Sequence, residues 1–128
     1  MGWFSKSSSA STMESRKIEI ELQKMITASS QEGLRTIISN ISYIETSLFG
    51  CVDSIKNNEL GVAKVQLNKA SETIIEVNTA LGQFEQTMMA AGLDPKKAEK
   101  ASKLFKELHA IISQLDAQEK EIRKEKAW

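Results

Sequence analysis

Histidine, cysteine and carboxylate side chains are the groups through which this chain could bind a metal ion or transfer a proton. His109 is its only histidine and Cys51 its only cysteine. A di-iron helical bundle uses a Glu-x-x-His pair on each of two helices, whereas Glu107 stands two residues before His109. A zinc site and a histidine proton relay lack their partner residues as well. We therefore expect no catalytic residue, no metal site and no cofactor, and a protein that is not an enzyme.

His109 and Cys51 suit structural positions instead. We expect His109 at the edge of the apolar face of a C-terminal helix. Cys51 falls in a core-facing position of another helical pattern, where a thiol away from basic groups behaves as a small apolar side chain. A single cysteine cannot form an internal disulfide, so nothing in the sequence calls for an oxidising compartment.

A locally basic segment, residues 94–106, is the strongest charge feature. The whole chain has 17 basic and 17 acidic residues, and this balance disfavours nucleic acid as a partner because phosphate binding needs excess cations. Lysines on one face of this segment can contact an anionic lipid surface or an acidic partner, or simply form a solvated face. The candidate residues for an anionic surface are Lys96, Lys97, Lys100, Lys103 and Lys106.

The N-terminal residues combine two aromatic rings with a serine-rich stretch. Residues 1–12 have too little apolar content to fold alone, so we predict a flexible tail. An amphipathic ring and a cation both suit a membrane interface, and Met-Gly approaches the N-myristoylation pattern, although Lys6 stands where that pattern needs Ser or Thr. The membrane-contact candidates are Gly2, Trp3, Phe4 and Lys6. The alternative is a passive end, or a ring pair that packs on the rest of the protein.

Three other apolar side chains are candidate contacts for a protein partner. Met88 and Met89 are adjacent near the end of a predicted helix, where flexible thioethers form either a pliable recognition surface or core filling. Trp128 is the last residue, and an exposed ring there would serve as a docking peg. The alternative for Trp128 is a side chain that packs back on the protein.

Long apolar stripes define the elements that must position these side chains. From Leu60 to Met88 apolar residues recur at alternating three- and four-residue steps, which predicts one long helix with a coiled-coil seam. A second such series runs from Leu34 to Ile55, and a third from Ala98 to Ile122. The seam of the longest helix consists of Leu60, Ala63, Leu67, Ala70, Ile74, Val77, Leu81, Phe84 and Met88.

Turn residues separate the stripes. Asn57 and Asn58 suit a C-cap followed by a new N-terminus. Gly92 suits the residue after a helix, Asp94 an N-cap and Pro95 the first turn of the next helix.

The boundary of the first helix is less clear from the sequence. Ser29 and Glu32 have the spacing of a capping box just before Gly33, which favours a break there. A continuous helix through Gly33 is the alternative.

These elements predict an all-α fold, an elongated antiparallel helical bundle with coiled-coil-like packing. It has three long helices and a shorter N-terminal one, and neighbours joined by short turns run antiparallel. We expect a tail over 1–12 and a single domain over 13–128. The expected helices span about 13–29, 31–57, 59–91 and 95–126.

A bundle with narrow apolar seams predicts an interaction module, either a small adaptor or scaffold that binds a protein partner or a self-assembling subunit. The alternative is a peripheral membrane protein anchored by its N-terminal head. A third possibility is a small apolar ligand bound between helices, beside Phe84, Met88, Phe105 and Leu108. Without a spanning segment or a signal peptide, the expected location is the cytoplasm, including the inner face of a membrane.

Overall fold

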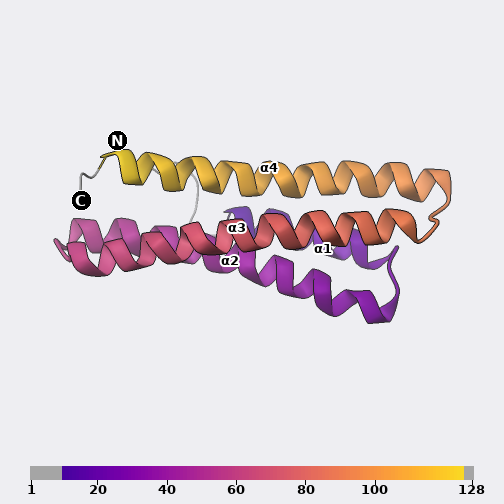
Figure 1. Cartoon of the computed structure of the whole chain (residues 1–128), viewed down its shortest axis with the longest axis horizontal. Helices are drawn as coiled ribbons and strands as arrows, with labels where there is room; N and C mark the ends of the chain where they lie inside the picture. The colour runs from indigo at the N-terminus through magenta and orange to yellow at the C-terminus, as the bar shows by residue number, and fades with distance from the viewer. Residues whose placement is uncertain (1–9, 126–128) are drawn as a thin grey trace.

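Four helices form an elongated bundle in the computed structural model, which describes residues 10–125 (Figure 1). Each helix runs antiparallel to the one before it. The predicted all-α bundle of three long helices and a shorter first one is confirmed. The helices are α1 (Ala10–Gln23), α2 (Ala28–Lys56), α3 (Leu60–Ala90) and α4 (Pro95–Glu125).

The short first helix makes the two halves of the bundle different. α1 has 14 residues, whereas α2 has 29. It packs against α2 and α4 and does not contact α3, so it forms the fourth side of the bundle beside the N-terminal half of α2 (Figure 1). α2 also packs against α3 and α4, and its C-terminal half extends beyond the start of α1 (Figure 1).

The start of α1 corrects the predicted tail, because residues 10–12 are helical. The carboxylate of Glu45, on α2, accepts hydrogen bonds from the backbone N–H groups of Ser11 (2.9 Å) and Thr12 (3.1 Å) and from the Thr12 hydroxyl (2.7 Å). These amides lie in the first turn, where a helix has no internal partner for its N–H groups. Residues 1–9, with the candidates Gly2, Trp3, Phe4 and Lys6, and residues 126–128, with Trp128, lie outside the described part of the chain.

The break between α1 and α2 lies earlier than the sequence pattern places it. α1 ends at Gln23, and α2 begins at Ala28 with Thr27 as its N-cap. The predicted capping box is wrong, since Ser29 lies inside α2 and its hydroxyl is 2.9 Å from the hydroxyl of Thr27. Gly33 is an interior residue of α2.

The other two turns have the expected geometry except at the start of α3, where the N-cap is Glu59 and not an asparagine. Asn57 is the C-cap of α2, and Asn58 adopts a left-handed conformation with φ 60°. Gly92 has φ 83°, and the Asp94 carboxylate accepts a hydrogen bond from the backbone N–H of Lys97 (3.0 Å). This cap starts α4 at Pro95, so α3 and α4 form an antiparallel hairpin.

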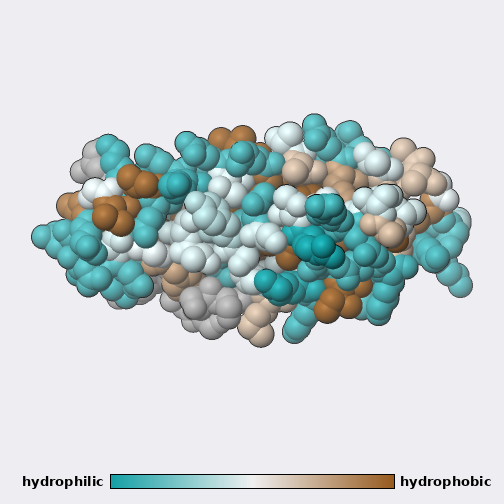
Figure 2. Space-filling view, turned by 90° about the horizontal axis from the view of Figure 1, so that it is seen from below, coloured by the Kyte–Doolittle hydropathy of each residue, from teal (hydrophilic) through white to brown (hydrophobic). Residues whose placement is uncertain are grey.

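One hydrophobic core runs through the bundle and contains nearly all of the predicted seam. Leu60 is the exception, with 46% of its surface exposed, because it is the first residue of α3 and lies beside the turn. Phe84 is partly buried, and its ring centroid lies 6.2 Å from that of the fully buried Phe105. Exposed apolar side chains occur as separate groups among polar ones on the face shown in Figure 2, as is ordinary for a protein surface.

Candidate interaction groove

The five lysine candidates are exposed on α4, and one of them contacts an acidic side chain of α1. Lys100 Nζ lies 2.9 Å from the Glu21 carboxylate, which also accepts a hydrogen bond from Lys24 at 3.1 Å. These two cations lower the pKa of Glu21, Lys100 having the larger effect. Lys100 is therefore part of an α1–α4 contact as well as of the basic face.

His109 and Cys51 lie where their structural interpretations placed them. His109 is half exposed beside the core, and its Nε2 lies 3.0 Å from a carboxylate oxygen of Glu85 on α3. Cys51 is fully buried, and burial raises the pKa of its thiol. Within residues 10–125 no three His, Cys, Asp or Glu side chains are placed to hold a metal ion. None of the helices described is both long and apolar enough to cross a membrane.

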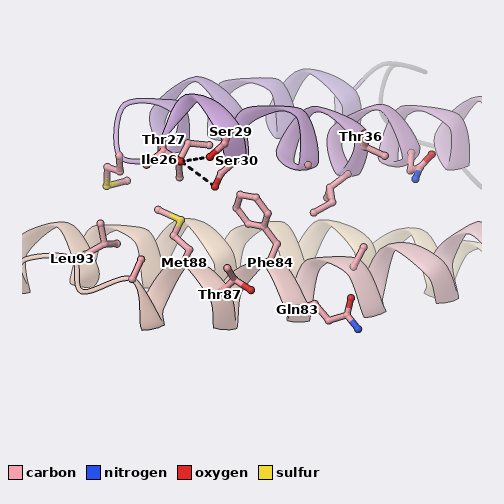
Figure 3. Close-up of a pocket in the computed structure, with 16 residues that line it drawn as sticks. Ile26, Thr27, Ser29, Ser30, Thr36, Gln83, Phe84, Thr87, Met88 and Leu93 are labelled. Atoms are coloured by element: carbon pink, nitrogen blue, oxygen red, sulfur yellow. Dashed lines mark hydrogen bonds between the residues drawn. The ribbon is translucent and has the colours of Figure 1, made fainter.

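The two methionine candidates separate in the structure. Met89 is exposed on the surface of α3, whereas Met88 is 93% buried and borders a groove between α2 and α3. The side chains of Met88 and Phe84 rise from α3 toward α2 (Figure 3). The groove has a cavity volume of about 640 Å³ and lies between the N-terminal half of α2 and the C-terminal half of α3.

Among residues 10–125, none of the side chains that line this groove is charged, although 27% of the residues in the chain are charged. Its apolar side chains include Ile37 and Phe84, and Met25, Ile26 and Leu93 lie at the end near the turns. The polar lining groups are hydroxyls and amides. Such a surface can bury apolar atoms without removing a charge from water, which is the main cost at charged interfaces.

Small side chains on the two walls explain why the groove is there. On α2 the lining includes Gly33 and Thr36, and on α3 it includes Ala80 and Ala91. None of these can fill the space between the helices, and α2 diverges from α3 toward this end of the bundle (Figure 1). Phe84 reaches across part of the gap, since a Cβ atom at Gly33 would lie 3.6 Å from its ring.

The sequence located this groove only in part. Phe84 and Met88 line it, as the third hypothesis expected, but Phe105 and Leu108 are fully buried in the core and do not line it. The α2 wall was missed. The available signal was the run of small and hydroxyl-bearing residues at one face of α2, beside a stripe that is otherwise aliphatic.

A second cavity of about 370 Å³ lies between α1 and α4, and its lining is different. Glu14, Lys17 and Glu107 border it. A partner that covered this cavity would have to remove water from these charged groups, which is costly. The α2–α3 groove is therefore the better candidate for a binding surface.

The fold and the groove together define a four-helix bundle with an uncharged surface depression between two of its helices. No protein-family model, curated protein or solved structure matches the chain.

Proposed function

We propose that this protein is a non-enzymatic interaction module, a small adaptor or scaffold, that binds a protein partner in the groove between α2 and α3. The observation that carries the proposal is the uncharged lining of a groove of about 640 Å³. Apolar surface removed from water contributes about 25 cal/mol per Å². A partner that covers the groove gains this contribution without desolvating an ion.

The side chains in the groove suit a partner surface. Met25 and Met88 have flexible thioether chains, which adapt to irregular surfaces, and Phe84 offers a ring. Aromatic and methionine side chains are enriched at protein interfaces, whereas lysine and glutamate are depleted. The partner is either another protein or a second copy of this chain, and a net charge of zero gives no long-range repulsion between copies.

A small apolar ligand is the second candidate for the same groove. Its volume falls within the range of about 300–1,000 Å³ that small-molecule sites have. The groove lies on the surface between two helices, which favours a macromolecule that extends beyond it. Membrane binding through Gly2, Trp3 and Phe4 remains a prediction about residues outside the described range.

Site-specific photo-crosslinking in the cells that make the protein tests the proposal. A photoreactive amino acid is placed at Thr36, which lines the groove, and in a matched control at Thr46, an exposed threonine of the same helix outside it. We expect discrete protein adducts at Thr36 that are absent at Thr46. An adduct of twice the mass of the chain would identify a second copy as the partner. Equal labelling at both positions, or adducts of small molecules alone at Thr36, would contradict a protein partner in the groove.

A further inference from the structure

We infer that the occupant of the groove is a basic amphipathic α-helix of the partner, an inference that rests on the proposed function and names the partner's chemistry. Its apolar face would lie on the uncharged lining, and its lysine or arginine side chains would lie along the rim. The shape of the walls, the length of the groove and the charge beside it each support one part of this statement.

The walls favour a helix over an extended segment. Both are α-helices, α2 and α3, whose backbone N–H and C=O groups bond within each helix. An extended peptide obtains much of its affinity from backbone hydrogen bonds to an open strand edge, and these walls offer none. A helix satisfies its own backbone and needs only side-chain contacts, so it loses no hydrogen bond on entering the groove.

The length of the groove fits a short helix. On α3 the lining extends from Ala80 to Ala91. The eleven steps between these two residues, at a rise of 1.5 Å per residue, give about 17 Å, or about three helical turns. A helix of this length presents an apolar stripe from positions three and four residues apart.

Carboxylates stand beside the lining on both walls. On α2, Glu32 lies one turn before Thr36, whose hydroxyl donates to the Glu32 carbonyl (3.0 Å), so the two share a face. On α3, Glu76 lies one turn before Ala80. Both glutamates are exposed, and neither forms an ion pair with another side chain among residues 10–125.

Two of the cations close to the lining in sequence, Arg35 and Lys24, are directed elsewhere. Arg35 is two residues from Gly33 and therefore lies on the opposite side of α2. Lys24, beside the lining residue Met25, pairs with Glu21 of α1. An uncharged floor with acidic flanks is complementary to an apolar stripe with basic flanks, and complementarity of this kind sets partner choice.

A defined probe tests this inference on the full chain. The probe is a fluorescein-labelled peptide of leucine and lysine, about 14 residues long and amphipathic as a helix, and the comparison is its leucine–glutamate counterpart. Fluorescence anisotropy gives the dissociation constants. The matched variants are Gly33→Arg, which fills the groove beside Phe84, and Gly82→Arg, which adds the same side chain to α3 in open space.

We expect the leucine–lysine peptide to bind the native chain and Gly82→Arg alike and to bind Gly33→Arg at least about tenfold more weakly. The leucine–glutamate peptide should bind the native chain about tenfold more weakly, and Glu32→Gln with Glu76→Gln should remove most of that difference. If Gly33→Arg does not fold, Thr36→Arg against Thr46→Arg gives the same comparison. Equal binding to groove and control variants, equal binding of both peptides, or binding of neither overturns the inference. Crosslinking at Thr36 then decides separately whether the proposed function still holds.

Discussion

The contact between α2 and α3 has two different halves. In the closed half, the C-terminal half of α2 packs tightly on the N-terminal half of α3. In the open half, the N-terminal half of α2 and the C-terminal half of α3 border the groove. In the closed half, Cys51 and Leu67 are fully buried, and the Gln66 amide covers Gly50 so closely that a Cβ atom there would lie 2.8 Å from its Nε2. In the open half, the corresponding gap at Gly33 is 3.6 Å to the Phe84 ring, and the groove lies alongside it. The same two helices thus supply stability at one end and an uncovered surface at the other.

Polar residues differ in the same way between the two halves. In the closed half the Ser54 hydroxyl donates to Gln66 Oε1 at 2.9 Å, so these two side chains satisfy each other across the interface. In the open half the hydroxyl of Thr36 donates to a carbonyl of its own helix. The polar groups of the open half make no such bridge between the helices, which leaves the gap available to a partner.

Truncating a core side chain in each half should give the largest effect. Leu67→Ala removes a fully buried leucine from the closed half, and we expect a loss of about 2–5 kcal/mol in the free energy of unfolding. Met88→Ala in the open half should cost at least about 1 kcal/mol less, because the space it leaves opens into the groove and no closed cavity forms. Urea denaturation followed by circular dichroism measures both. Equal losses would mean that the groove is not open in solution.

Glu45→Ala tests whether a local contact keeps α1 packed beside the open half, because the Glu45 carboxylate binds the first turn of α1 to α2. The substitution leaves the Ser11 and Thr12 amides without an acceptor, and we expect a cost of about 1–3 kcal/mol. Hydrogen exchange should quicken in α1, while amides of the closed half keep their protection. Glu32→Ala, an exposed glutamate of the same helix, serves as the control, with an expected change within about 0.5 kcal/mol. Uniform loss of protection across all helices would contradict a local role.

The two glycines of α2 should respond differently to alanine. Gly33→Ala places a methyl group at an ordinary contact distance from Phe84, so the gain in helix propensity should stabilise the protein by about 0.5–1 kcal/mol. Gly50→Ala displaces the Gln66 amide, and the lost hydrogen bond from Ser54, worth about 1 kcal/mol, should offset the same gain. Thermal unfolding of the two variants checks the difference. A greater gain at Gly50 than at Gly33 would reverse the assignment of closed and open halves.

The smallest effect on stability is expected from the titration of Glu21, which contacts Lys100 where α1 meets α4. Lys100 and Lys24 lower the pKa of Glu21 below its ordinary value of 4.5. A carboxyl group whose pKa is lower in the folded state stabilises the protein above its unfolded pKa, and this contribution is lost as the pH falls through the folded pKa. Glu21→Gln should therefore lower the melting temperature slightly at pH 7 and converge with the native chain in acid. A difference that grows toward low pH would contradict this sign.

Local patterns in the sequence predicted most of the fold. The apolar stripes fix which face of each helix is buried, and Gly92 and Asp94 define the α3–α4 turn through their own backbone preferences. The cap on α1 could not be predicted, because Glu45 lies 33 or 34 residues from the amides that it binds. An apolar stripe also does not show which polar residues beside it are buried, and Glu45 and Glu119 are only 4% exposed.

The groove was less predictable than the fold. A stripe shows that Phe84 and Met88 face inward, but it does not show that α2 diverges beside them, since that depends on the pairing of side chains from separate helices. Phe105 and Leu108 have the same apolar pattern, but they are fully buried in the core and do not line the groove. Small residues such as Gly33 indicate either a close approach or a gap, and only the structure distinguishes the two.

The methionine methyl groups offer the most direct test of the central claim that the partner binds in the open half. Of the methionines within residues 10–125, Met25 and Met88 line the groove, whereas Met13 and Met89 do not. The chain is labelled with ¹³C-methyl methionine, and the protein captured by crosslinking at Thr36 is added during NMR measurement. Our account predicts that the Met25 and Met88 signals shift while those of Met13 and Met89 stay in place. Shifts at Met13 and Met89 with Met25 and Met88 unchanged would contradict it.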